Sequence, residues 1–323
     1  MFNLTALEAA LAGTVFAGKL HFFPMTDSTN ADALAAARNG APHGSVWFAD
    51  EQRAGRGRGD HAWHSPAGEG LYASILLRPS ISAVRLPLLP LAAGLAAADA
   101  IRAVCGLTVD LRWPNDLLVS TARSESDPWA PPPATPQSGQ RKLGGILAEA
   151  KTEGSSVAYA VVGIGINVHQ RRFAEELQPE QQPPTDGAPG FSTPATSLDL
   201  ETGVPGDSES LANGSAAMEW RDRHSQRGRQ AEHPVSRQAL LVSLLKSLER
   251  EALGLADPAA GERIIWRVES ASTWVRNRRV EVHGPQACTG ITAGLDEHGF
   301  LLVRTATGLV TVHTGGIRDA AIP

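Results

Sequence analysis

The sequence predicts an α+β fold, a mixed, largely antiparallel sheet with helices, followed by a small β-barrel. Apolar runs bounded by turn residues predict strands, and regular helices do not separate them as they would in a doubly wound parallel sheet. Ala-rich stretches predict helices at 30–39 and 88–104. After about residue 271 the chain changes to short strands with frequent turn signals, a pattern typical of a small barrel.

The individual elements follow from local patterns. Asn30 is a suitable N-cap for the first helix, and Gly40 is a suitable C-terminal stop. Apolar residues at helical spacing predict a packed amphipathic helix over 237–255. These elements divide the chain into a large domain, 1–270, and a small domain, 271–323. The predicted strands lie at 20–25, 45–49, 71–77, 107–112, 145–150 and 157–164, and polar or Pro-rich loop insertions at about 120–140, 178–194 and 203–236.

Composition and charge exclude several classes of protein. The chain has 323 residues and a formal net charge of -5, so it has no overall basic character for nucleic acid or an anionic membrane. The first 30 residues lack the features of a signal peptide, and no uninterrupted apolar run of about 18 residues occurs. We expect a soluble cytoplasmic protein with no nucleic-acid or membrane partner. Cys105 and Cys288 lie far apart, which argues against disulfides and a structural zinc site.

A short loop alternates glycine and arginine in the stretch "GRGRG". Gly55, Gly57 and Gly59 allow unusual backbone conformations and present bare N–H groups, while Arg56 and Arg58 offer planar forks that suit carboxylate or phosphate. The loop therefore suits an anion. It is not a P-loop, because no Gly-Lys-Ser/Thr follows. A surface turn or a flexible RNA-binding segment remains the alternative interpretation.

Two further motifs carry polar groups on stiff turns. In "RWPND", Pro114 fixes an extended turn from which Asn115 and Asp116 project, either as a turn with Asx capping or as a polar pair aimed at a ribose, a phosphate-bound Mg²⁺ or a lysine. In "RKLGGILAE", Lys142 precedes a glycine pair and is either a solvated lysine or a charge-stabilising group in a cleft.

The stretch "VVGIGINVH" ends a predicted buried strand with two glycines. These glycines permit close approach of a ligand or of another strand, and Asn167 supplies a neutral hydrogen-bonding group. No direct metal-binding motif is present, since His61 and His64 lack the spacing and acidic partners of a metal site.

Taken in order, "TDSTN", "DEQRAGRGR", "LRWPND", "RKLGGILAE" and "VGIGINV" closely resemble the biotin protein ligase family, from about residue 20 to the end. The resemblance implies a class II synthetase-like catalytic domain that binds biotin and ATP, followed by an SH3-like barrel that assists ATP and carrier engagement. The chain resembles the monofunctional type of this family, which lacks an N-terminal DNA-binding domain, because only some 20 residues precede the first core strand. No DNA-binding role is therefore expected.

The resemblance also implies an activity. The family forms biotinyl-5'-AMP from biotin and ATP with release of pyrophosphate, and then transfers biotin to a lysine of a carrier domain. The expected substrates are biotin and ATP, with Mg²⁺ as the metal of the nucleotide. The expected partner is the biotin carboxyl carrier domain of a biotin-dependent carboxylase.

Residue roles carry over only to matching positions. Arg58 and Lys142 would stabilise charge during adenylate formation, and Asp116 would help to deprotonate the incoming lysine and lie near the Mg²⁺. Residues 55–58 would close over the adenylate as a lid, although Asp60 and His61 replace the usual Gly-Arg of this loop. The biotin-binding candidates are Ser28, Thr29, Asn30, Gln52, Gly55, Arg56, Gly57, Arg58, Lys142, Gly144 and Gly145. The nucleotide-binding candidates are Arg56, Arg58, Trp63, Asn115, Lys142 and Asn167.

Three other functions stay open. Lipoate ligases and octanoyltransferases share the catalytic fold and also transfer acyl groups to a carrier lysine. A non-enzymatic biotin sensor or regulator is a different class, and the retained Arg58, Asp116 and Lys142 and the missing DNA-binding module argue against it. An RNA-binding module would explain the Arg/Gly loop, but the acidic net charge and the aromatic content of 5% argue against it.

Overall fold

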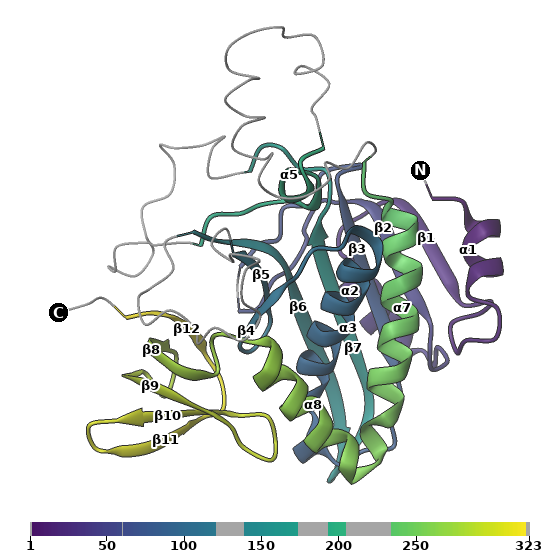
Figure 1. Ribbon diagram of the computed structural model, residues 1–323. Coiled ribbons are helices and arrows are strands. Elements are labelled where there is room, and N and C mark those ends of the chain that lie inside the picture. Colours follow the sequence, from purple (N-terminus) through teal and green to yellow (C-terminus); the bar gives the residue numbers. More distant parts are fainter. Residues whose placement is uncertain (1, 60, 121–138, 174–192, 205–233, 321–323) are drawn as a thin grey trace, which may run out of the picture.

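Two sheets organise the computed structural model, which describes residues 2–59, 61–120, 139–173, 193–204 and 234–320 (Figure 1). The larger sheet has seven strands in the order β1-β2-β3-β7-β6-β5-β4. Only β1 and β2 pair in parallel, and the other neighbours are antiparallel. This confirms the predicted mixed, largely antiparallel sheet. Its strands are β1 (Leu20–Thr26), β2 (Val46–Gln52), β3 (Gly70–Leu77), β4 (Asp110–Arg112), β5 (Asp116–Ser120), β6 (Gln140–Glu153) and β7 (Ser156–Asn167).

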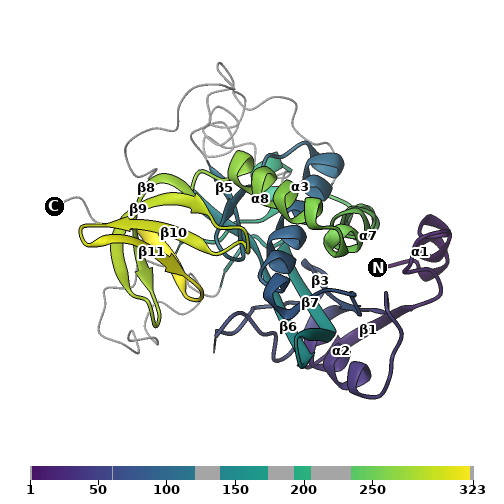
Figure 2. The ribbon, with the colours of Figure 1, turned by 90° about the horizontal axis from the view of Figure 1, so that it is seen from below.

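Helices cover both faces of this sheet. The helices α3 (Leu88–Cys105), α7 (Arg237–Leu253) and α8 (Pro258–Ala271) lie on one face, and α2 (Thr29–Arg38) lies on the other (Figure 2). Side chains alternate along β3, so Ile75 and Leu77 belong to the main core whereas Leu76 packs in a smaller core beneath α2. Ser74 points to the same side as Leu76 and meets Thr29 at the start of α2, and both residues line the same cavity.

The start of α2 differs from the prediction. The helix begins at Thr29, and the Oγ of Ser28 accepts a hydrogen bond from the N–H of Ala31. The predicted cap, Asn30, was wrong, because it is already helical and its side chain is buried in another network. Gly40 follows the helix with φ of +83°, which confirms the predicted stop.

Helix α3 is the most apolar helix of the described chain. By length and composition it could cross a membrane, but 61% of it is buried, and it packs against α7, α8 and the large sheet. Burial of this extent is what a core helix of a folded domain shows.

The C-terminal strands form a separate antiparallel sheet in the order β11-β10-β9-β8-β12. The predicted closed barrel is not found among the described residues, because the end strands β11 and β12 do not pair with each other. The sheet lies beside β4 and β5 (Figure 1), and the indole N–H of Trp113 donates to the carbonyl of Gly299 at 3.1 Å. Its strands are β8 (Arg276–His283), β9 (Cys288–Leu295), β10 (Leu301–Thr305), β11 (Gly308–Val312) and β12 (Gly316–Asp319).

Some elements had no prediction. The sequence analysis missed α8, although its Asp257 cap followed by Pro258 is a typical helix start. The predicted loop insertions fall largely outside the described residues. The other unpredicted elements are α1 (Leu4–Ala10), η1 (Ala83–Arg85), β5, α5 (Leu198–Thr202) and η3 (Gly254–Ala256).

Candidate active site

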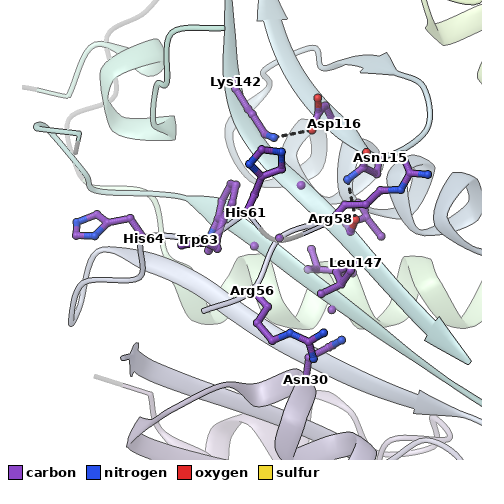
Figure 3. A pocket seen from close by; sticks show the side chains of 18 of the residues that line it. Asn30, Arg56, Arg58, His61, Trp63, His64, Asn115, Asp116, Lys142 and Leu147 are labelled. Carbon is purple, nitrogen blue, oxygen red and sulfur yellow. Dashed lines mark hydrogen bonds and ion pairs between the residues drawn. The ribbon is translucent and has the colours of Figure 1, made fainter. Parts of the chain in front are cut away.

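A cavity of about 790 Å³ lies between β3, β6, β7, the Arg/Gly loop and the C-terminal sheet (Figure 3). Most of the site residues predicted from the sequence line it. These are Ser28, Thr29, Asn30, Gln52, Arg56, Gly57, Arg58, Trp63, Asn115, Asp116, Lys142, Gly145 and Asn167.

Two predicted residues, Gly55 and Gly144, do not line the cavity but lie behind it. A Cβ atom on Gly55 would lie 2.4 Å from the carbonyl oxygen of Trp63, and one on Gly144 would lie 2.6 Å from that of Gly165. Real Cβ atoms essentially never come so close to backbone. These glycines therefore let the cavity walls pack closely.

One end of the cavity is neutral and densely hydrogen-bonded. The Oε1 of Gln52 accepts from the N–H and the hydroxyl of Thr29 at 2.9 and 3.1 Å, and its Nε2 donates to Ser65 at 2.9 Å. The hydroxyl of Ser74 lies 2.8 Å from that of Thr29 and donates to the Oδ1 of Asn30 at 3.0 Å. Uncharged donors and acceptors fixed in this way suit a polar but uncharged ligand.

The other end is charged. The carboxylate of Asp116 accepts from Arg112 Nε at 3.0 Å and Nη2 at 2.6 Å on one oxygen, and its other oxygen lies 2.7 Å from Lys142 Nζ (Figure 3). Burial alone would raise the pKa of the Asp116 carboxyl. The charges and hydrogen bonds of Lys142 and Arg112 outweigh burial and hold the pKa below its ordinary value of 3.8. Asp116 is therefore an ionised organiser of two cations.

The Lys142 backbone is fixed by a neighbouring segment. Its N–H donates to the carbonyl of Pro194 at 2.7 Å, and its carbonyl accepts from Thr196 N–H at 2.9 Å. The ammonium lies 5.7 Å from the centre of the Trp63 ring, and the side chain is 32% exposed. The group that faces the cavity is thus a positioned but accessible positive charge.

The two arginines of the Arg/Gly loop have different partners. Arg56 pairs with Glu149 at 3.1 Å, and Glu149 also accepts from Asn30 Nδ2 at 2.6 Å. Arg58 reaches the C-terminal sheet, where it donates to the hydroxyl of Thr314 at 2.7 Å and to the carbonyl of Gly315. The loop therefore spans the cavity from the neutral end to the second sheet.

The amides of two predicted residues bind backbone. Asn115 Nδ2 donates to the carbonyl of Ile146 at 3.0 Å, and Asn167 Nδ2 donates to that of Thr196 at 2.9 Å. Both therefore shape the wall of the cavity. Trp63 lies close against Gly165, where a Cβ would be 2.6 Å from the indole nitrogen, and this nitrogen is buried with no hydrogen-bond partner in the described chain.

Several residues that line the cavity had no prediction. The motif that contains Arg112 was interpreted only through Asn115 and Asp116. The proximity of Arg112 to Asp116 in the sequence is the signal that could have identified it as a site residue. The histidines His61 and His64 also line the cavity, and no group of three or more His, Cys, Asp or Glu suited to a metal occurs among the described residues. The C-terminal sheet contributes a wall that no sequence signal located, formed by His283, Gly284, Pro285, Thr314, Gly315 and Gly316.

The cavity thus joins an uncharged polar end to a cationic end. Of the described residues that line it, four are arginine or lysine and one, Asp116, is acidic. Such a site can hold a ligand with a neutral polar head next to phosphate or carboxylate groups.

Two family models match the chain. Residues 22–167 match the model described as "Biotin/lipoate A/B protein ligase family", and residues 277–317 match the "Biotin protein ligase C terminal domain". The first match contains nearly all of the larger sheet and most of the cavity residues. The second match contains most of the C-terminal sheet.

Named relatives agree with these models. The biotin--[acetyl-CoA-carboxylase] ligase of Mycobacterium tuberculosis is 30% identical over 308 residues, which cover 93% of this chain and 88% of the relative. The bifunctional ligase/repressor BirA of Bacillus spizizenii is 36% identical over 174 residues, which cover 53% of this chain and 48% of the relative. The chain thus spans about half of the length of this bifunctional relative.

A solved structure has the same fold. The biotin protein ligase from Aquifex aeolicus in complex with biotin and ATP aligns with a TM-score of 0.62 and 24% sequence identity. The alignment covers 94% of this chain and 100% of the solved chain.

Proposed function

The chain belongs to the biotin protein ligase family, and we propose that it is an ATP-dependent biotin–protein ligase. It forms biotinyl-5'-AMP from biotin and ATP, releases pyrophosphate, and transfers biotin to a lysine of a carrier domain. The observation that carries this proposal is that one cavity combines a neutral hydrogen-bonding end with a cationic end.

The neutral end suits the ureido ring of biotin, which is polar but uncharged. Thr29 and Gln52 are pre-oriented by each other, and both line the cavity together with Ser28 and Asn30. Groups held in place before the ligand arrives lose little freedom on binding. We therefore assign the biotin head to this end and its valeryl carboxylate to the direction of Lys142.

The charged end suits adenylate formation. A carboxylate oxygen of biotin attacks the α-phosphorus of ATP, the bond to the β-phosphate oxygen breaks, and pyrophosphate leaves. Two anions must approach, and negative charge builds up on the α-phosphate oxygens. Lys142 and Arg58 are placed to stabilise this charge, and Arg112 adds a third cation nearby. Trp63 offers an apolar wall for the adenine.

Magnesium enters with ATP as part of the substrate. Asp116 is the one carboxylate among the described residues that line the cavity, but its two oxygens are paired with Arg112 and Lys142, so the phosphates of the nucleotide would be the main ligands of the ion. Bound in this way, Mg²⁺ would neutralise the charge of the leaving pyrophosphate.

The role of Asp116 as a base for the incoming lysine is weakened by its contacts. A carboxylate whose pKa lies below 3.8 accepts a proton poorly, and its two oxygens are already paired with Arg112 and Lys142. We propose instead that Asp116 orients Lys142. The incoming amine then attacks the acyl carbon of biotinyl-5'-AMP, the bond from that carbon to the phosphate oxygen breaks, AMP leaves, and the amine proton passes to water or to the phosphate of the departing AMP.

Residues 55–58 form the proposed lid. An acyl-adenylate is a mixed anhydride that water destroys, so an ordered lid that excludes water protects it. The Arg58 contacts to Thr314 and Gly315 already hold the loop across the cavity. Asp60 lies outside the described residues, so its effect on the lid stays a prediction.

The proposed partner is the biotin carboxyl carrier domain of a biotin-dependent carboxylase, in keeping with the names of the relatives. We propose a class II synthetase-like domain over 1–270 and an SH3-like domain over 271–323 that assists ATP and carrier engagement. The relatives' names favour biotin over lipoate or octanoate.

The test is a transfer assay with three acids. The chain is incubated with MgATP, a purified carrier domain and either biotin, lipoate or octanoate, and the carrier mass is measured. We expect modification of one lysine with biotin and none with the other acids. A carrier that gains lipoate or octanoate, or that stays unmodified with biotin, would contradict the proposal.

A further inference from the structure

A short junction joins α8 to β8 and is hydrogen-bonded to β4, the strand that carries Arg112. The N–H of Thr273 donates to Asp110 Oδ1 at 2.9 Å, and its hydroxyl donates to Asp110 Oδ2. The hydroxyl of Ser272 donates to the carbonyl of Leu111. Asp110 and Leu111 are the two residues of β4 before Arg112, so the junction is fixed directly beside the charged end of the cavity.

Trp274 is the next residue of this junction and is only 2% exposed. Two guanidinium groups lie over its indole ring. The Cζ of Arg278, on β8, is 3.6 Å from the ring centre, and the Cζ of Arg112, on β4, is 5.2 Å from it. A cation over an indole face within about 6 Å is attracted by the ring, most strongly when water is excluded.

The two arginines belong to different sheets. Arg278 donates to both carboxylate oxygens of Asp319 at 2.6 and 2.7 Å, which ties it to β12. Arg112 donates to Asp116 with two nitrogens, and its third nitrogen donates to the hydroxyl of Thr193 at 2.7 Å. The ring is thus near both a cation of the C-terminal sheet and a cation of the candidate active site.

We propose that Trp274 is a positioning residue that sets the reactivity of Lys142 through Arg112 and Asp116. The inference rests on the proposed function and adds to it a residue outside the cavity. With its planar group held over the indole, Arg112 occupies one oxygen of Asp116. The other oxygen is left to hold the Lys142 ammonium at 2.7 Å.

Loss of the Trp274 ring should affect Arg112 first and Lys142 through it. If the ring is lost, Arg112 gains rotational freedom and its paired contacts to Asp116 loosen. Lys142 then loses its fixed direction at the site where phosphate charge develops. Thr29, Gln52 and Ser74 at the neutral end are held by hydrogen bonds of their own, so the head of biotin keeps its contacts and biotin binding should change little.

The test compares three variants with the wild type. Trp274→Leu keeps an apolar side chain without the ring face, Trp274→Phe keeps an aromatic face, and Trp266→Leu removes an indole that is 68% exposed on α8. Biotin-dependent pyrophosphate exchange gives kcat and the KM for ATP. Calorimetric titration gives the Kd for biotin and for a non-hydrolysable MgATP analogue, and thermal unfolding checks the fold.

We expect Trp274→Leu to lower kcat/KM for ATP about tenfold, to weaken the analogue, and to leave the Kd for biotin within about twofold. Trp274→Phe should recover most of the loss, and Trp266→Leu should match the wild type. The decisive comparison is a double-mutant cycle with Arg112→Lys. Since Trp274 acts through Arg112, adding Trp274→Leu to Arg112→Lys should cost far less than it costs in the wild type.

Equal losses in both backgrounds, or equal weakening of biotin and the analogue, would overturn the inference. If Trp274→Leu does not fold, Trp274→Met, which also lacks the ring face, gives the same comparison with and without Arg112→Lys. A wild type without exchange would instead refute the proposed function, and the analogue titrations would then decide the inference alone.

Discussion

The two ends of the cavity hold their side chains by different means. At the neutral end, Thr29, Asn30 and Ser74 are each 4% exposed or less and bind one another through short neutral hydrogen bonds. At the charged end, Arg112, Asp116 and Lys142 are 12 to 32% exposed and depend on one carboxylate shared by two cations. We propose from this difference that the neutral end is a rigid recognition end and that the charged end rearranges its ion pairs when substrate binds.

The contrast predicts separate consequences for binding and chemistry. Removal of one buried neutral group should weaken ligand binding, because its hydrogen-bond partner is left unsatisfied. Removal of a charge that meets ATP and the transition state should lower the rate and also weaken nucleotide binding. The predictions below run from the largest expected effect to the smallest.

Lys142→Met should give the largest effect. The loss of the charge aimed at the reacting phosphate should lower kcat for biotin-dependent pyrophosphate exchange by about 10² to 10³ fold. Lys151→Met is the matched control, since this lysine lies on the same strand but is 59% exposed near Glu153. A Lys142→Met enzyme with more than a tenth of wild-type kcat would contradict the assignment.

Asp116→Asn tests the shared carboxylate. Removal of its charge should lower the free energy of unfolding by about 2 kcal/mol at pH 7, because two partly buried cations lose their partner. The pKa of Asp116 is lowered in the fold, so its contribution is present above the ordinary value of 3.8 and is lost as pH falls through the lowered value. Urea unfolding of both proteins should give a constant difference from pH 8 to 5 and a smaller one at pH 3. A difference that already shrinks between pH 8 and 6 would refute the pairing.

Gln52→Ala tests the neutral end. It leaves the N–H of Thr29 without its acceptor, so the KM for biotin should rise about tenfold while the KM for ATP stays within about twofold. Gln238→Ala, at the exposed contact to Asn3, serves as the control. If the KM for ATP rose as much as that for biotin, the division of the cavity would fail.

Glu149→Gln should give the smallest effect. The Arg56 and Glu149 side chains are 48% and 27% exposed, and pairs of this kind stabilise a protein by about 1 kcal/mol or less. The glutamine can still accept from Asn30. Thermal unfolding should therefore differ only slightly from wild type, and a large loss would place Glu149 with the charged end.

Sequence patterns located the parts of the site that lie in local motifs. The Arg/Gly loop, Asn115, Asp116 and Lys142 stand next to prolines or glycines whose backbone preferences can be read directly. The mixed sheet could be predicted because helices do not alternate regularly with its strands. The predicted N-cap of α2 was wrong by two residues because Ser28 and Asn30 are both good capping residues. Only the burial of Asn30 against Ser74, which the sequence does not show, identifies Ser28 as the cap.

The remaining contacts depend on tertiary structure. Arg58 meets Gly315 across a sequence separation of 257 residues, and Trp274 meets Arg112 across the junction between the sheets. No local pattern encodes such pairs. The expected barrel closure failed for a similar reason, because turn signals predict the strands of the C-terminal sheet but not which edges pair.

The most direct test of the two-ended cavity is a crossed binding titration. Biotin and a non-hydrolysable MgATP analogue are each titrated calorimetrically into Gln52→Ala and Lys142→Met. We predict that Gln52→Ala weakens biotin about tenfold and spares the analogue, whereas Lys142→Met weakens the analogue more than biotin. Equal weakening of both ligands by each variant, or the reverse pattern, would contradict the account.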